Sequence, residues 1–337
     1  MGNAAAGNAP LLETRALSVT YHTPTGPVTV VREVDLTIRR GEFLGIVGES
    51  GSGKSQLLLA LLGLSAPGAV LAGSIRHAGA ELVGAGEAAL NRIRGDRIGM
   101  IFQDPMTALN PYLTVGLQIG EVLQLHRGLD RTAALRRAAE LLDAVQITEA
   151  RRRLAQYPHE LSGGMRQRVM IAMALACEPG ILLADEPTTA LDVTVQAQIL
   201  DLLRELRART GTAVVLVTHD LGVVAELADR IAVMYAGRFV EEAPAETLFA
   251  ASRHPYTEAL KRSIPRIDAA LPERMPTIPG SPPNPAGLPA GCAFAPRCAF
   301  RLERCCVGAA PPLRSVGAGH RNACCRDDLT AAGAGGA

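Results

Sequence analysis

One octapeptide of the chain has the residue types and spacing of a triphosphate-binding loop. Residues 48–55 read Gly-Glu-Ser-Gly-Ser-Gly-Lys-Ser, which fits the pattern G-x-x-x-x-G-K-[ST]. Glycines let backbone N–H groups turn toward phosphate oxygens, while Lys54 would reach the β- and γ-phosphates and the Ser55 hydroxyl would bind Mg²⁺. A glycine-rich turn can match so short a pattern by chance. The predicted nucleotide-binding residues here are Gly48, Ser50, Gly51, Ser52, Gly53, Lys54 and Ser55.

The flanks of this loop have the patterns that would position it. Residues 42–47 form a continuous apolar run typical of a buried strand, and residues 56–62 form an apolar stretch typical of a helix. A helix that begins directly after the loop points its positive N-terminal end at the phosphates. The sequence therefore predicts a strand, a phosphate loop and a helix in that order.

A second anion site is predicted where Leu161-Ser162-Gly163-Gly164-Met165 leads into an apolar helix. Ser162, Gly163 and Gly164 would present backbone N–H groups at the N-terminus of that helix. Serine is also a favoured N-cap, so Ser162 alone would indicate only that a helix begins there. Two such helix N-termini in one chain are harder to explain by chance.

Polar side chains follow three further apolar runs. Asp185 and Glu186 end residues 181–186; Asp185 suits a Mg²⁺ shell, and Glu186 could polarise an attacking water. Gln103 ends a predicted strand at residues 97–103, where it could touch a ligand at the carboxyl edge of a sheet, although an ordinary loop amide fits equally well. His219 ends the run that starts at residue 212, and a histidine taken alone there indicates a structural hydrogen bond.

The elements around these residues can be predicted from their patterns. Residues 11–40 alternate apolar and polar side chains about a turn rich in proline and glycine, which predicts two strands. Tyr21, in the first strand, could stack on a nucleotide base, but a half-buried strand tyrosine is the simpler interpretation. Residues 73–79 indicate a hairpin. Residues 113–155 have a helical pattern without a strand-like interruption, so a helical insertion separates the early strands from the later ones.

Composition excludes several classes of protein. Among 337 residues, 34 Lys and Arg nearly balance 33 Asp and Glu, which gives no electrostatic reason to expect nucleic acid as the main partner. No run approaches the roughly 18 apolar residues of a membrane-spanning helix. The N-terminus lacks the basic and apolar segments of a secretory signal. We therefore expect one large cytoplasmic domain with an appendage.

With these residues assembled, about residues 10–250 resemble the nucleotide-binding subunits of ATP-binding cassette (ABC) transporters. The resemblance implies an α/β P-loop NTPase fold with an antiparallel β subdomain, a helical subdomain at about residues 105–178 and a cysteine-rich C-terminal extension. It identifies residues 48–55 as the Walker A loop, Gln103 as the Q-loop, residues 161–165 as the signature, Asp185 and Glu186 as the Walker B end, residues 190–192 as the D-loop, His219 as the H-loop and Tyr21 as the adenine-stacking residue.

The same resemblance implies an ATPase whose cofactors are ATP and Mg²⁺. Mg²⁺ would be held by Ser55, Gln103 and Asp185. Glu186 would be the catalytic base, with His219 and Gln103 sensing the γ-phosphate. In family members the signature of one subunit completes the ATP site of the other, which gives Ser162, Gly163 and Gly164 their contact with the γ-phosphate.

Residues 102–111, 157–168 and 254–257 narrow the resemblance to the oligopeptide, dipeptide and nickel import branch. It implies a second ATPase subunit, a paralogue in preference to an identical chain, two integral-membrane permease subunits and an extracytoplasmic solute-binding protein. The chain would lie peripherally on the cytoplasmic face of the inner membrane. Peptides are the expected solute, with nickel or metal chelates as the alternative. A regulatory or non-transport ABC ATPase is the alternative from another class, although Glu186 and His219 oppose it.

The appendage begins where the composition changes. The predicted cassette covers residues 10–262, and the extension covers residues 263–330, with a proline-dense stretch at its start. Six of the chain's 7 cysteines lie beyond residue 290. Clustered thiols in a reducing compartment indicate a metal in preference to disulfides. Four thiolates suit either iron–sulfur or zinc, although the spacing is wider than zinc knuckles use, and unligated thiols remain an alternative.

Some peptide-importer subunits with a similar C-x5-C-x6-C pattern hold a [4Fe–4S] cluster. That resemblance would make Cys292, Cys298, Cys305 and Cys324 the cluster ligands. Cys306 and Cys325 directly follow two of these residues, so they leave the choice of ligand open.

Overall fold

The computed structural model describes residues 9–189, 191–264 and 277–326. The chain divides into two compact units. One comprises residues up to Leu12, Thr37–Glu42 and His77–Leu216; we call it the helical unit. The other comprises Glu13–Leu36, Phe43–Arg76 and the chain from Val217 onward; we call it the P-loop unit.

The P-loop unit contains two groups of strands. In the first, β1 (Leu12–Thr23) lies between β2 (Gly26–Ile38) and β4 (Ala69–His77). Because only two residues join β1 to β2, these strands run antiparallel, which confirms the predicted strand, turn and strand. In the second group, β3 (Phe43–Val47) pairs in parallel with β9 (Arg230–Tyr235), and β9 pairs antiparallel with β10 (Arg238–Pro244).

The predicted strand, loop and helix around residues 48–55 are confirmed. All five residues of β3 are buried, and α1 (Lys54–Leu61) begins directly after the loop. Three further helices complete this part of the unit: α9 (Leu221–Ala225), α10 (Ala245–Ala251) and α11 (Pro255–Arg262). The buried apolar strands β3 and β9 thus fix the start of the phosphate loop.

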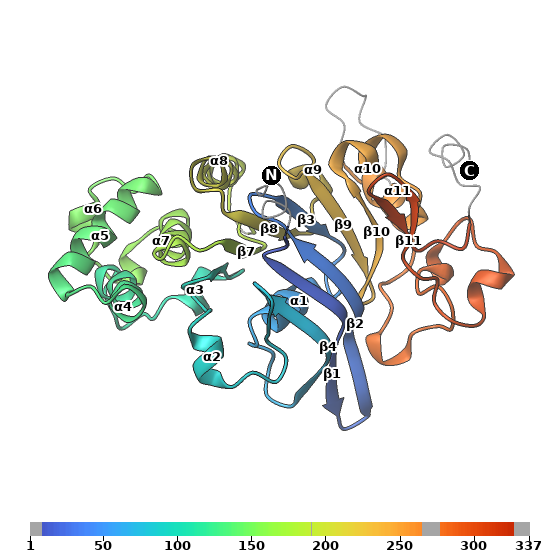
Figure 1. Cartoon of the computed structure of the whole chain (residues 1–337). Helices are drawn as coiled ribbons and strands as arrows, with labels where there is room; N and C mark the ends of the chain where they lie inside the picture. Colours follow the sequence, from blue (N-terminus) through green and yellow to red (C-terminus); the bar gives the residue numbers. More distant parts are fainter. Residues whose placement is uncertain (1–8, 190, 265–276, 327–337) are drawn as a thin grey trace, which may run out of the picture. The chain divides into compact units, whose positions relative to one another are not determined.

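The helical unit combines short parallel strands with a helical subdomain. β6 (Ile98–Ile101) pairs in parallel with β7 (Ile181–Asp185), and β8 (Ala213–Thr218) carries the chain out of the unit. Figure 1 shows the main helices of the subdomain gathered together in green. The other elements of the helical unit include β5 (Ala80–Glu81), α2 (Glu87–Asn91), α3 (Pro105–Ala108), α4 (Val115–Arg127), α5 (Arg131–Ala144), α6 (Ala150–Arg153), α7 (Gly163–Leu175) and α8 (Val193–Thr210).

Two predicted boundaries differ from the structure. The helical pattern of residues 113–155 is divided into three helices, because Gly128 takes a left-handed conformation after α4 and Glu149 does so before α6. The strand predicted to reach Gln103 ends two residues earlier, at Ile101, so Gln103 lies in the following loop. Periodicity identifies the element type but not the turn residues that end it.

Strand pairing joins the C-terminal extension to the rest of the P-loop unit. β12 (His320–Asn322) pairs antiparallel with β10, with Glu241 opposite Asn322, and β11 (Arg314–Gly317) pairs with β12. Figure 1 shows the extension in orange and red. Short 3₁₀ turns occupy Pro285–Gly287, Ala295–Arg297 and Glu303–Cys306. Part of the predicted proline-rich stretch, residues 265–276, lies outside the described residues.

A buried polar cluster links α11, β10 and β12. Glu241 is fully buried; its carboxylate accepts hydrogen bonds from the backbone N–H groups of Arg253 (2.6 Å) and His254 (3.1 Å) and lies 2.8 Å from His320 Nε2. His254 caps α11, because its Nδ1 accepts a hydrogen bond from the N–H of Tyr256. Burial lowers the pKa of His254 from 6.5 to about 4, although the Glu241 charge opposes the shift.

This lowered pKa makes stability depend on pH. The unfolded chain protonates His254 near its ordinary pKa of 6.5, whereas the folded chain keeps it neutral down to about 4. Neutral His254 therefore makes its full contribution to the free energy of unfolding above pH 6.5. This contribution is lost as the pH falls toward 4, and it can reach about 3 kcal/mol. In His254→Asn, which retains a capping oxygen but does not titrate, we expect the free energy of unfolding to fall less between pH 7 and 4.5. Urea denaturation at both pH values would show this, and identical losses in both proteins would contradict it.

Candidate nucleotide-binding site

The glycines of the phosphate loop are required by their surroundings. Gly48 is buried, and a Cβ there would lie 2.2 Å from the carbonyl oxygen of Met234 in β9. Gly53 has a φ of +103° as the N-cap of α1, and its Cβ would lie 2.5 Å from the carbonyl oxygen of Val30. Both positions therefore admit only glycine without a shift of backbone.

Lys54 folds back over the loop that precedes it. The residue is only 4% exposed, and its Nζ donates to the carbonyl oxygens of Gly48 (2.7 Å) and Glu49 (3.0 Å). A further backbone bond, from the Gly237 N–H to the Ser52 carbonyl (2.8 Å), holds the loop to the turn after β9. The positive charge is thus fixed at the centre of the loop, where a nucleotide's phosphates would meet it.

Two other predicted residues lie in the same unit. Tyr21 is half-buried on β1, and its hydroxyl donates a 2.6 Å hydrogen bond to Gln56 Oε1 on α1. The bond ties the tyrosine ring to the helix that begins at the phosphate loop. His219 is exposed and directly follows β8, while the next residue, Asp220, caps α9. The stacking role of Tyr21 and the sensing role of His219 remain predictions.

The acidic pair lies in the helical unit, at the end of β7. Asp185 is 6% exposed, and Glu186 takes a left-handed backbone conformation, with a φ of +44°. Glu186 Oε2 accepts hydrogen bonds from Thr189 Oγ1 (2.9 Å) and from Gln103 Nε2 (3.3 Å). A non-glycine residue in this conformation is strained, and such strain is concentrated at functional sites. The structure therefore brings Gln103 and Glu186 together.

Thr189 is a contact that the sequence patterns did not identify. It lies three residues after Glu186 in the same loop, and its own backbone N–H also bonds to the Glu186 carbonyl (3.1 Å). The available signal was this spacing, because an i, i+3 threonine can reach back to the first residue of a turn. The next predicted segment, the D-loop at residues 190–192, begins with Ala190, which lies outside the described residues.

The signature residues form the start of α7. Ser162 is the N-cap, and its Oγ accepts a 3.3 Å hydrogen bond from the Met165 N–H. Ser162 and Gly163 are exposed, whereas a Cβ on Gly164 would lie 3.1 Å from a Val195 side-chain carbon. The first turn of a 13-residue helix thus presents its N–H groups on the surface of the helical unit.

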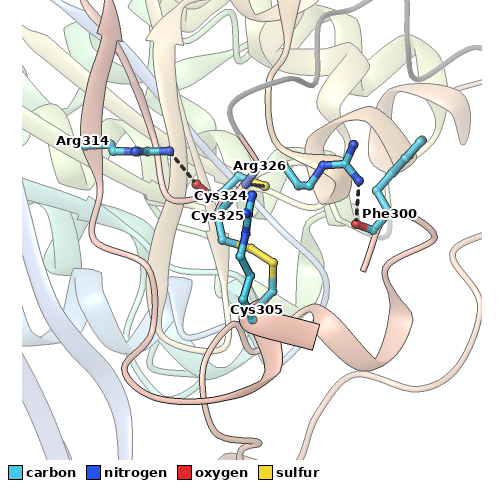
Figure 2. The surroundings of a disulfide bond; sticks show 7 residues. Phe300, Cys305, Arg314, Cys324, Cys325 and Arg326 are labelled. Carbon is cyan, nitrogen blue, oxygen red and sulfur yellow. Dashed lines mark hydrogen bonds between the residues drawn. A yellow bond between two sulfur atoms is a disulfide. The ribbon is translucent and has the colours of Figure 1, made fainter. Parts of the chain in front are cut away.

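The cysteines of the extension gather around one small cavity. Cys292, Cys298, Cys305, Cys324 and Cys325 line it together with His254, whose buried Nε2 has no hydrogen-bond partner among the described residues. Burial raises the pKa of the Cys324 thiol to about 11. Figure 2 shows that Cys305 and Cys325 form a disulfide, and that Arg314 donates to the Cys324 carbonyl while Arg326 donates to the Phe300 carbonyl.

This pairing differs from the predicted ligand set. Cys292, Cys298 and Cys324 are not in a disulfide, but Cys305 is bonded to Cys325, so the four predicted ligands are not available together as thiolates. The described residues also contain no group of three or more His, Cys, Asp or Glu side chains placed to hold a metal ion. The prediction that Cys305 is a cluster ligand therefore does not match the structure. The spacing of the cysteines could not reveal this disulfide, because Cys305 and Cys325 approach each other only when the C-terminal extension folds.

The geometry described so far, a strand, a Gly48–Ser55 loop, a helix and a second glycine-rich helix N-terminus, defines an ATP-binding cassette. Residues 31–189 match the ABC transporter family, and residues 240–305 match the oligopeptide/dipeptide transporter C-terminal region. The chain is 53% identical to the oligopeptide transport ATP-binding protein OppD of Haemophilus influenzae, covering 94% of this chain and 97% of that protein. OppD of Salmonella typhimurium is also 53% identical, with 93% of each chain covered.

Solved structures agree with this classification. The dimeric structure of MJ0796, a bacterial ABC transporter cassette, is 34% identical with a TM-score of 0.63, and it covers 69% of this chain and 98% of that one. A post-hydrolysis state of the same cassette, bound to ADP and Pi, is equally similar. The chain belongs to the OppD-type ATP-binding subunits of ABC transporters, and it is an ABC ATPase. No helix in the described ranges is long and apolar enough to cross a membrane.

Proposed function

We propose that the chain is the ATP-hydrolysing subunit of an importer that takes up oligopeptides through separate membrane permeases. The observation that carries this proposal is its 53% identity to an oligopeptide transport ATP-binding protein over 94% of the chain. The match of residues 240–305 to the oligopeptide/dipeptide transporter C-terminal region adds to it. Transport of nickel or a metal chelate by the same motor is the alternative outcome, because the cassette itself does not meet the solute.

The residue roles form part of the proposal. Lys54 and the N–H groups of the loop bind the phosphates, and Tyr21 stacks on the adenine. Ser55, Asp185 and Gln103 would hold Mg²⁺, which neutralises phosphate charge when bound. Glu186 takes a proton from the attacking water, with His219 and Gln103 sensing the γ-phosphate. The carboxylate position fits this role, because Gln103 and Thr189 already fix one of its oxygens.

The proposed pairing of two ATPase subunits rests on the exposure of the signature at the start of α7. Ser162, Gly163 and Gly164 would close the ATP site of a second ATPase subunit, a paralogue in preference to a second copy. The dimeric structure of the MJ0796 cassette supports a two-subunit arrangement. Two permease subunits would anchor the pair at the cytoplasmic face of the inner membrane, with a solute-binding protein outside. We place the boundary between cassette and extension at residue 262.

Reconstitution of the complex tests the transport function. The chain, its candidate paralogue and the permeases would be assembled in proteoliposomes, with the solute-binding protein added outside. We expect ATP-dependent uptake of a labelled oligopeptide and a peptide-stimulated ATPase rate. Uptake of nickel in place of peptide would establish the alternative substrate. ATPase activity that no solute changes, without uptake, would instead support a regulatory or non-transport ATPase.

We also propose, as a separate function of the extension, that its cysteine cavity holds a metal group in the reduced protein. The five cysteines that line the cavity support this, whereas the Cys305–Cys325 disulfide opposes a four-thiolate site as the chain stands. Reduction of that bond would free Cys305 to join Cys292, Cys298 and Cys324. Iron and acid-labile sulfide in protein purified anaerobically would indicate a cluster. Zinc without iron would indicate a zinc site instead, and metal-free protein would contradict both the cluster and the zinc site.

A further inference from the structure

An ion pair joins the C-terminal extension to the phosphate-binding loop. Arg297, whose side chain is only 5% exposed, donates from Nη1 to Glu49 Oε2 (2.6 Å) and from Nη2 to Glu49 Oε1 (2.9 Å). Glu49 is the second residue of the loop, 248 positions earlier in the chain. A bidentate arginine–carboxylate pair fixes direction as well as distance.

Arg297 is itself held by residues of the extension and by a tyrosine of β9. Its Nε donates to the carbonyl oxygen of Pro279 (2.8 Å), and its guanidinium lies 6.0 Å from the ring centroids of both Tyr235 and Phe294. Phe294 and Tyr235 meet edge to face with centroids 5.3 Å apart. The arginine is thus seated in a packed aromatic site and has little freedom to follow a moving loop.

The loop is held at Glu49 by its backbone as well. The Glu49 N–H donates a 2.8 Å hydrogen bond to the hydroxyl of Tyr256, a residue of α11 that is fully buried. The Tyr256 ring packs 4.6 Å from that of Tyr235 and 5.3 Å from that of Phe294. One aromatic cluster therefore supports both bonds to Glu49.

The ion pair between Arg297 and Glu49 affects the charge that a bound nucleotide would meet. The loop is built to receive the negative phosphates of ATP, yet it carries a carboxylate of its own. The ion pair neutralises that carboxylate, and the hydrogen bonds to Glu49 raise the pKa of Arg297, so the arginine stays charged at every relevant pH. Without Arg297, the half-buried carboxylate would be left unpaired beside the phosphate site, where reduced screening strengthens repulsion.

We propose that Arg297 is a positioning residue of the nucleotide site: by neutralising and orienting Glu49, it makes the affinity of the Walker A loop for MgATP depend on the C-terminal extension. The inference rests on the proposed use of this loop for ATP. It assigns to the extension a role in the ATPase cycle that is separate from any metal in its cysteine cavity.

The test compares two single substitutions that break the same ion pair. In the reconstituted importer, Arg297→Gln leaves Glu49 charged and is expected to raise the KM for MgATP about tenfold, with kcat changed less than about twofold. Glu49→Gln removes the carboxylate and is expected to leave KM within about twofold of the wild type. The double variant should regain most of the affinity that Arg297→Gln loses. A bond that serves only to hold the fold would weaken both single variants alike.

Controls separate failure of this inference from failure of the proposed function. Arg301→Gln changes an exposed arginine of the same segment and should leave KM unchanged. Arg297→Lys keeps the charge without the bidentate geometry and should fall between the wild type and Arg297→Gln, which keeps the test usable if the glutamine variant folds poorly. An unchanged KM in Arg297→Gln, or a double variant as weak as Arg297→Gln, would overturn the inference. A wild-type protein that does not bind MgATP would overturn the proposed function instead.

Discussion

Replacing Glu186 with glutamine is expected to lower the ATPase rate of the assembled complex about 10³-fold while MgATP binding persists. Glu186 lies at the end of β7, and its Oε2 accepts hydrogen bonds from Gln103 and Thr189. A glutamine has nearly the same shape, and its amide oxygen can accept both bonds, so the loop should keep its conformation. What disappears is the ability to take a proton from the attacking water. Single-turnover ATPase and equilibrium nucleotide binding, measured on the same preparation, would separate the two effects.

A matched control is available in the same unit. Glu205 is an exposed carboxylate on α8, and Glu205→Gln removes an equal charge without touching the acidic pair. We expect this variant to hydrolyse ATP at the wild-type rate. If Glu186→Gln also turned over at that rate, Glu186 would not be the base. If it lost nucleotide binding as well as hydrolysis, the residue would serve the shape of the loop instead.

Short-range features of the site could be predicted from the sequence because local chemistry determines them. The spacing of Gly48, Gly53 and Lys54 reflects a loop that must turn tightly and expose its N–H groups, and the structure has this loop between β3 and α1. Ser162 was recognisable as an N-cap because its hydroxyl precedes a helix with glycines in the first turn. These signals lie within about ten residues of the group that they position.

Long-range contacts could not be predicted in the same way. Gln103 meets Glu186 across 83 positions, and Arg297 meets Glu49 across 248. Neither pair leaves a periodic pattern, because the two partners belong to separate parts of the chain and only the packing of the strands or of the C-terminal extension brings them together. The disulfide between Cys305 and Cys325 is the same kind of contact, and here the family resemblance implied a ligand set in which Cys305 is not bonded to Cys325.

The extension shows how a segment without regular patterning can still be ordered. β12 has only three residues, yet two of them pair with buried positions of β10, and His320 reaches the buried Glu241 carboxylate. Composition alone indicated only a proline-dense stretch followed by clustered thiols, because strand pairing and buried hydrogen bonds leave no mark on composition. The extension is therefore ordered by contacts with β10, a strand of the cassette.

Replacing Lys54 with alanine should lower the affinity for MgATP about 100-fold. The side chain is nearly buried, and its Nζ bonds to two carbonyl oxygens of the loop, so its charge is already oriented before a nucleotide arrives. A hydrogen bond to a charged group contributes about 1.5–3 kcal/mol, and a 100-fold loss of affinity, about 2.7 kcal/mol, corresponds to one such bond to the phosphates. Alanine also removes the hydrogen bonds from Nζ to the Gly48 and Glu49 carbonyls, so the loop loses two bonds that hold its conformation. Isothermal titration with MgATP would measure the change directly.

The composition of the chain provides an unusually clean control for this substitution. Lys54 and Lys261 are its only two lysines. Lys261 lies on α11, where it pairs with Glu258 at 3.1 Å, so Lys261→Ala should leave nucleotide affinity unchanged. An amine-reactive reagent would then report on two lysines besides the N-terminal amine, and MgATP should protect only Lys54. Equal protection of both lysines, or full affinity in Lys54→Ala, would show that the charge of Lys54 is not what holds the phosphates. Protection of Lys54 alone would place the nucleotide within reach of its Nζ.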